Sequence, residues 1–168
     1  MDPLKQFRAD LTRSQWVIGR QVEGLTHEDS LIQPPFRGNC LNWVLGHIAV
    51  HRGLLVKALG GEDPVSEDLR RRYGNASEPV RGASDTPYSL EQLLAELKGL
   101  KEGIEQRMEG RTAADLDAVV DVERGTTASS RLAFLAWHEA YHVGQTELLR
   151  QLAGKDVRLL FAMENPRG

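Results

Sequence analysis

Cysteine is nearly absent from this sequence. Cys40 is the single cysteine among 168 residues. One cysteine can form no internal disulfide and cannot supply a cysteine-rich zinc module. Any metal chemistry must therefore rest on histidine and oxygen ligands. Cys40 lies near the predicted start of a helix, where a thiol pKa can be lowered, but a lone cysteine there is more often a small buried residue.

Long hydrophobic runs are missing as well. The segment from Met1 to Lys5 begins a charged amphipathic stretch and lacks the apolar run of a secretory signal. No window is long and apolar enough to cross a bilayer. We therefore expect a cytoplasmic protein without a membrane partner.

Charge of one sign is not concentrated anywhere along the chain. The net charge is -3, and the 21 Lys and Arg residues are spread out, apart from the short run Arg70 to Arg72. A nucleic-acid-binding protein usually carries a clustered basic footprint. We therefore expect no nucleic-acid partner.

Apolar residues recur at steps of three and four, the spacing of amphipathic helices. The pattern predicts four long helices, over Leu4 to Leu25, Leu41 to Leu59, Leu90 to about Gly110, and about Thr127 to just before Gly154. A capping box at Ser89 marks the third. The segment from Ser66 to Gly74 has acidic residues first and basic residues last, which is typical of one short helix.

The four helices predict an all-α four-helix bundle, and the length suits a single domain over residues 1–168. The connection from Gly61 to Tyr88 is too long for a hairpin between neighbouring helices, so we expect a crossover between helices 2 and 3. A short extended piece is expected between Leu116 and Val122. The tail after Val157 has no assigned element, and three of its apolar residues are available to pack on the bundle: Leu159, Leu160 and Phe161.

Two histidines in the last helix are the most informative feature of the chain. His138 and His142 lie four residues apart, so both imidazoles project from one helix face and can bind one metal ion. His47, on the second helix, can complete a three-histidine site with open coordination positions, as in catalytic metal centres. His51 shares a face with His47, and the sequence leaves its part in the site open. Zinc (Zn²⁺) suits such ligands best, with nickel (Ni²⁺) as an alternative.

Three residues beside these histidines are candidate catalytic residues. Gln145 follows His138 and His142 along the same line of the helix. Glu139 and Tyr141 lie on either side of that line, within reach of a metal-bound water. Each is a candidate for an acid-base or oxyanion role.

Tryptophan and glycine in the helices also predict packing. Trp16, Trp43 and Trp137 are expected in the core, and the last two lie close to the proposed ligands. Glycine lowers helix propensity, so its presence inside a helix suggests that another helix or a ligand approaches closely. Three positions carry this expectation: Gly46, Gly53 and Gly144.

One literal motif match is to the zincin proteases. His138 to His142 reads H-E-x-x-H, the pattern in which the glutamate activates a metal-bound water. The match stops there, because the metzincin extension would require a glycine at Gln145 and a further histidine beyond it. The remaining glutamates offer no well-placed third ligand, since Glu147 is angled away on the same helix and Glu164 lies in the tail.

Two segments together resemble the DinB/YfiT-like family of metalloenzymes. They are Asn42-Trp43-Val44-Leu45-Gly46-His47-Ile48 and His138 to Gln145, with its Tyr-His-x-Gly-Gln ending. The resemblance covers essentially the whole chain and implies a four-helix bundle with His47, His138 and His142 as the metal ligands. It also implies that a homodimer is common. Some members of the family are thiol-dependent S-transferases or isomerases that use bacillithiol, mycothiol or glutathione.

These observations lead to one main hypothesis and two alternatives. The main hypothesis is a metal-dependent enzyme that joins a low-molecular-weight thiol to an electrophilic small molecule, an S-transferase, in which Gln145, Glu139 or Tyr141 steers protons. The first alternative is a metal-dependent hydrolase with Glu139 as general base. The second is a non-catalytic bundle that binds metal or a partner.

Overall fold

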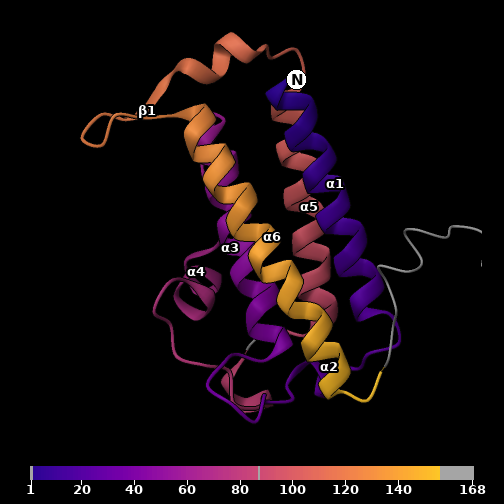
Figure 1. Ribbon diagram of the computed structural model, residues 1–168. Helices are drawn as coiled ribbons and strands as arrows, with labels where there is room; N and C mark the ends of the chain where they lie inside the picture. The colour runs from indigo at the N-terminus through magenta and orange to yellow at the C-terminus, as the bar shows by residue number, and fades with distance from the viewer. Residues whose placement is uncertain (1, 87, 156–168) are drawn as a thin grey trace, which may run out of the picture.

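Four long helices make up about half of the chain in the computed structural model, which describes residues 2–86 and 88–155 (Figure 1). In order, the elements are α1 (Pro3–Val22), α2 (His27–Ser30), α3 (Leu41–Ala58), α4 (Glu67–Tyr73), η1 (Ala83–Asp85), α5 (Leu90–Met108), η2 (Ala113–Asp117), β1 (Val119–Asp121), β2 (Thr126–Thr127) and α6 (Ala128–Leu152). The chain is therefore mostly helical, as the periodicity predicted. The expected packing of Leu159, Leu160 and Phe161 falls outside the described residues, as does Glu164.

Local sequence signals explain where the helices begin and end. Ser89 and Gln92 form the predicted capping box at the start of α5, and Ser66 caps α4, which confirms the short helix. Gly110 and Gly154 follow α5 and α6 with φ of 71° and 72°. This left-handed conformation suits glycine and ends a helix. The predicted boundaries of these helices are therefore confirmed to within a few residues.

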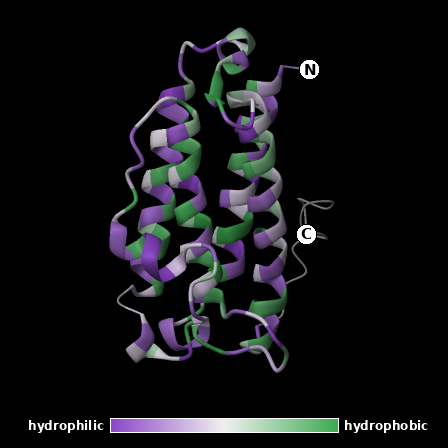
Figure 2. Ribbon diagram, turned by 90° about the vertical axis from the view of Figure 1, so that its left-hand side faces the viewer, coloured by the Kyte–Doolittle hydropathy of each residue, from purple (hydrophilic) through white to green (hydrophobic). Residues whose placement is uncertain are grey.

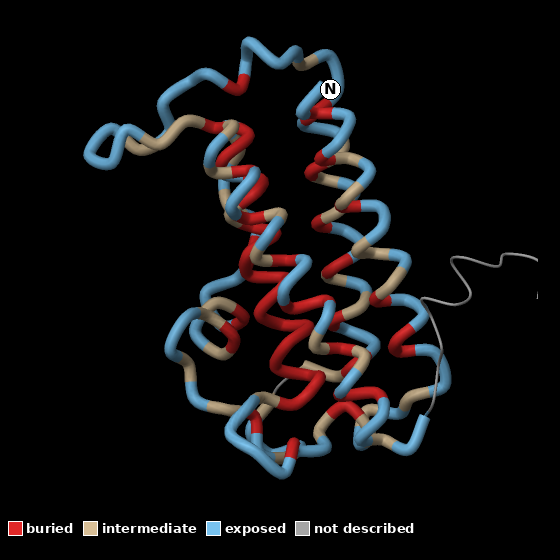
Figure 3. Tube along the Cα trace, viewed as in Figure 1, coloured by how far each residue is buried: buried red, intermediate tan, exposed pale blue. Residues whose placement is uncertain are grey.

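Helix α3 lies at the centre of the packing. Every residue of α3 is buried except Leu54 and Lys57. It packs along α5 and α6 and carries α4 on its remaining side, whereas α1 packs mainly on α6. Figure 2 shows hydrophobic and hydrophilic stripes along the long helices, and Figure 3 shows α3 as the most continuously buried of them. The polar residues of α3 are therefore enclosed by its neighbours.

A small hairpin interrupts the helical pattern before α6. Strand β1 pairs antiparallel with β2, and Val119 lies opposite Thr127. The extended piece expected in this region is confirmed, but its valines Val119, Val120 and Val122 are exposed. Within the described chain, no helix is both long and apolar enough to cross a membrane.

Candidate metal centre

Helices α3 and α6 bring four histidines together. His47 and His51 come from α3, and His138 and His142 come from α6. One ligand atom from each of His47, His51 and His138 lies within 4.8 Å of the other two, close enough to hold one metal ion. The Nε2 atom of His142 lies 3.2 Å from Nε2 of His138. The predicted ligands are thus neighbours, and His51 belongs to the same cluster.

Hydrogen bonds orient two of these imidazoles. Nδ1 of His47 lies 2.7 Å from the backbone oxygen of Tyr73, and Nδ1 of His142 lies 2.9 Å from Oε1 of Gln145. An oxygen partner requires each Nδ1 to carry the proton, so both Nε2 atoms keep a lone pair. These Nε2 atoms lie 3.4 and 3.2 Å from Nε2 of His138. This is the arrangement that usually orients metal-binding histidines.

Burial keeps the four imidazoles neutral. It is the main cause that lowers the pKa of each ring, with the neighbouring histidines as a further cause for His47, His51 and His138. The pKa falls to about 3 for His51 and to about 4 for His138. Neutral imidazole is the form that binds a metal. At neutral pH the cluster therefore presents nitrogen donors without repulsive charge.

Two ring nitrogens in the cluster have no hydrogen-bond partner in the part of the chain that the structure describes. Nδ1 of His51 and Nδ1 of His138 are buried and form no hydrogen bond within the described residues. A buried polar atom without a partner is costly. The neutral Nε2 donors of His47, His138 and His142 fit a divalent cation, and imidazole suits zinc, nickel, copper and iron alike.

The Tyr73 contact was not foreseen from the sequence, although Gly46 was a signal for it. A Cβ atom on Gly46 would lie 2.3 Å from Cγ of Tyr73, so only glycine lets the Tyr73 ring pack there. The Tyr73 hydroxyl donates to Oδ1 of Asn42 at 2.8 Å. Together these contacts dock α4 on α3 and bring the Tyr73 carbonyl to His47.

The other two glycines behave differently from one another. A Cβ on Gly53 would lie 2.4 Å from Oδ1 of Asp63, so the expected close approach is confirmed there. At Gly144 no atom lies within 4 Å of an added Cβ. Among the described residues no other helix therefore approaches closely at Gly144, and the expected approach of a ligand there stays a prediction.

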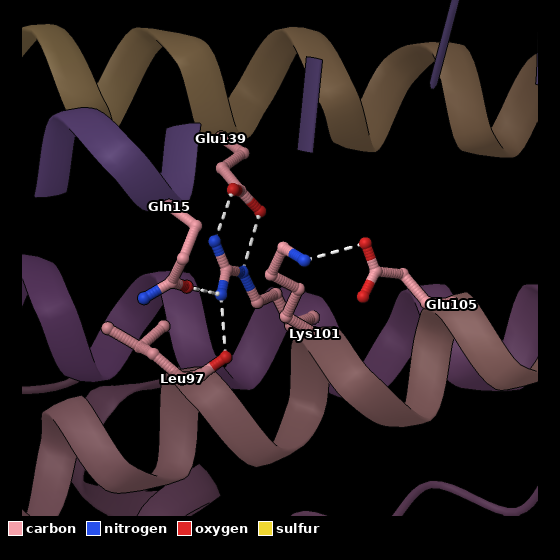
Figure 4. Close-up of polar contacts among 6 residues, drawn as sticks. Gln15, Leu97, Lys101, Glu105 and Glu139 are labelled. Carbon is pink, nitrogen blue, oxygen red and sulfur yellow. Dashed lines mark hydrogen bonds and ion pairs between the residues drawn. The ribbon is translucent and has the colours of Figure 1, made fainter. Parts of the chain in front are cut away.

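Glu139 belongs to a buried ion pair. Its oxygens accept from Arg52, at 2.7 Å from Nη2 and 3.1 Å from Nε. Nη1 of Arg52 also donates to Oε1 of Gln15 at 2.5 Å and to the backbone oxygen of Leu97 at 2.7 Å. Figure 4 shows Gln15, Leu97 and Glu139 converging on this point. One guanidinium thus joins all four long helices.

The role of Arg52 was not predicted from the sequence, although an arginine inside the apolar segment of α3 was an available signal. The side chains of Arg52 and Glu139 are 0% and 5% exposed. Both oxygens of Glu139 are engaged by Arg52, and in the described chain neither bonds a histidine. The carboxylate predicted to serve a metal-bound water is therefore held in the interior.

Aromatic residues border the histidines. Trp43 stacks on His47 with ring centroids 4.5 Å apart and is buried, as expected. Trp16 and Trp137 are exposed, so their expected place in the core is wrong. Tyr141 is 57% exposed, with its ring centroid 5.1 Å from that of His142. The centre thus has a closed side at Trp43 and an aromatic outer edge at Tyr141.

Cys40 lies at the N-cap of α3 and is fully buried. Burial raises the pKa of its thiol, and Sγ lies 3.5 Å from the backbone oxygen of Val80. This environment keeps the thiol protonated at neutral pH. Cys40 is therefore the buried packing residue that the sequence favoured.

Fold and site together define a helical protein with a histidine cluster suited to a divalent metal, set between two of its long helices. Residues 11–146 match the model of the DinB superfamily, and the chain belongs to this family. The resemblance drawn from the Asn42-to-Ile48 and His138-to-Gln145 segments is thereby confirmed.

A solved structure supports the fold. The crystal structure of a conserved protein from Enterococcus faecalis aligns with a TM-score of 0.73 and 18% sequence identity, covering 92% of this chain and 99% of that one. At this identity the likeness shows the fold alone. A comparison with curated proteins gives no match.

Proposed function

We propose that this protein is a metal-dependent enzyme in which His47, His138 and His142 hold a divalent cation. Zinc is the preferred metal, and nickel is the alternative. The convergence of two Nε2 atoms, those of His47 and His142, on Nε2 of His138 at 3.4 and 3.2 Å carries the proposal. The alternative set replaces His142 by His51, whose ligand atom also lies close to those of His47 and His138. We prefer His142 because Gln145 orients it, whereas Nε2 of His51 makes only a long contact, 3.4 Å to Asn75.

The chemistry proposed for the centre follows the family resemblance. A divalent cation bound there would act as a Lewis acid that lowers the pKa of a thiol at an open coordination position. Gln145 and the Tyr73 carbonyl position the ligands His142 and His47. Trp43 excludes water from one side, and Tyr141 stands at the exposed edge, where a substrate would enter. We propose transfer of a low-molecular-weight thiol to an electrophilic small molecule.

The hydrolase alternative loses support from the Glu139 geometry. A general base must reach the water it deprotonates. Both oxygens of Glu139 are occupied by Arg52 inside the protein. We therefore assign Glu139 a structural role and reserve Gln145 and Tyr141 for the site.

Elemental analysis of protein purified without a histidine tag tests the metal proposal. We expect near-stoichiometric metal in the wild type and its loss in His47→Ala and His142→Ala. His27→Ala is the matched control, because His27 lies outside the cluster and faces the start of α5. A His142→Ala variant that keeps its metal while His51→Ala loses it would replace our ligand set by the alternative one.

Conjugation of a thiol to 1-chloro-2,4-dinitrobenzene tests the transferase proposal. The thiolate sulfur bonds to the ring carbon, and chloride leaves. We expect turnover with bacillithiol, mycothiol or glutathione that requires metal and disappears in His142→Ala. Metal-loaded protein that turns over none of these thiols would favour the non-catalytic metal-binding alternative. Turnover that survives chelation would contradict the metal-dependent mechanism.

We also propose that the four long helices form a single-domain four-helix bundle with a crossover between α3 and α5. The long segment between these two helices, which contains α4, supports this topology. A cytoplasmic location and a homodimer stay predictions from the sequence and the family resemblance.

A further inference from the structure

A cavity of about 530 Å³ lies between the first halves of α1 and α6. Figure 1 shows these two helices diverging toward the end of the molecule where both begin. Leu55 of α3 and Leu116 of η2 complete the lining. The volume is within the range of about 300–1,000 Å³ that small-molecule pockets occupy.

This cavity is separate from the histidine cluster. Ala136 and Ala140 line it, and each is two residues from His138. Two residues correspond to a rotation of roughly 160° around a helix, so the cavity and His138 lie on opposite faces of α6. None of the four clustered histidines is among the residues that line the cavity.

The walls are predominantly apolar. Phe7, Leu11, Leu55 and Leu132 line the cavity, and all four belong to the same buried hydrophobic cluster. Apolar walls of this kind offer a water molecule few hydrogen-bond partners, and they accept apolar ligands. The occupant must therefore bring hydrocarbon surface.

The charged groups of the lining are already paired. Asp10 accepts from Arg13 at 2.7 Å, and Glu139 accepts from the buried Arg52 at 2.7 Å. The Asp10–Arg13 pair lies at the exposed rim, whereas the buried part of the wall offers an ionic ligand no free counter-ion, because Glu139 is already bound by Arg52. The hydroxyls of Ser14 and Ser129, which also line the cavity, can hydrogen-bond a neutral polar group.

We propose that this cavity is a second small-molecule site that binds an uncharged, mainly apolar molecule of the class of medium-chain alcohols and esters. The hydrocarbon part contacts Phe7, Leu11 and Leu132, and the neutral polar group faces Ser14 or Ser129. The site is independent of the metal proposal, because it shares no residue with the histidine cluster.

Fluorescence titration with N-phenyl-1-naphthylamine, an uncharged apolar probe, tests this site. We expect saturable binding at one site per chain, weakened about tenfold or more by Ala136→Trp, because an indole there fills the cavity. Ala140→Trp, at an exposed lining position, gives the same result in a variant that need not disturb the core. Circular dichroism confirms that both variants are folded.

Two controls and one comparison make the test specific. Lys98→Trp adds the same indole at an exposed position of α5, and His47→Ala removes a histidine of the cluster. Both should bind the probe as the wild type does. The anionic probe 8-anilinonaphthalene-1-sulfonate should bind at least about tenfold more weakly. Unchanged binding in both cavity variants, or equal affinity for the anionic probe, would overturn the proposal.

Discussion

At the scale of single residues, Gln145 acts on the proposed metal through His142. Its Oε1 holds the proton-bearing Nδ1 of His142 at 2.9 Å. Loss of such a partner typically lowers metal affinity about 10- to 100-fold. We expect this loss in Gln145→Leu, whereas Gln145→Glu keeps an acceptor oxygen and retains the affinity. Competition with a chromogenic zinc chelator measures both, and equal affinity in wild type and Gln145→Leu would refute the role.

The Arg52–Glu139 pair supports a second prediction at this scale. Removing one partner of a buried ion pair costs about 3–5 kcal/mol, because the other charge stays buried without compensation. We expect this loss in the free energy of unfolding for Glu139→Leu. The double variant Arg52→Met/Glu139→Leu should recover much of it, since neither charge remains. Urea unfolding of wild type, both single variants and the double variant gives the coupling energy. Additive losses would show that the pair contributes little.

At the scale of elements, the glycines of α3 and α6 give a matched comparison. Gly46→Ala forces a Cβ atom into the Tyr73 ring, so it should destabilise the protein and displace α4 from α3. Gly144→Ala meets open space in a helix, where alanine is favoured by up to about 1 kcal/mol. Thermal melting should move in opposite directions for the two variants. A Gly46→Ala protein as stable as the wild type would mean that α4 is not held by this contact.

The limits of sequence reasoning are also visible at the scale of elements. Helix boundaries could be predicted because their signals are local, such as the Ser89 capping box and the glycines after α5 and α6. The partner of Glu139 could not be predicted, because Arg52 lies 87 residues away and on another helix. The exposure of Trp137 had the same cause. Periodicity places a residue on a helix face but does not say which neighbour covers that face.

The candidate site could likewise be predicted from the sequence only in part. His138 and His142 could be predicted to share a metal ion from their spacing within one helix. His47 could be added to them from the family resemblance. His51 could not be placed, because His47 and His51 lie one turn apart and either can face α6. The structure puts the His51 ring 3.9 Å from that of His138, measured between centroids. This distance depends on how α3 packs on α6, which no local pattern records.

At the scale of the whole molecule, the histidine cluster predicts a pH dependence of stability. Folding lowers the pKa of His47, His51, His138 and His142 below the ordinary value of 6.5. Below about pH 6.5 the unfolded chain therefore binds more protons than the folded chain, and the metal-free protein loses stability as the pH falls. Above that value these histidines contribute no further change.

Thermal melting of chelator-treated protein between about pH 8 and 5 measures this dependence. The melting temperature should be flat in the upper part of the range and fall in the lower part. His51→Phe, which removes the histidine with the most strongly lowered pKa, should reduce the slope. A melting temperature that rises on acidification would show that the cluster gains protons on folding.

The buried Arg52–Glu139 pair also constrains how this sequence can change in evolution. A single substitution at position 52 or 139 leaves a lone charge enclosed by four helices, whereas exchanging both residues together removes the conflict. Viable variants should therefore alter the two positions as a unit. His51 directly precedes Arg52 in the chain, and His138 directly precedes Glu139. Such paired exchanges would therefore change the packing next to the metal centre while leaving its ligands in place.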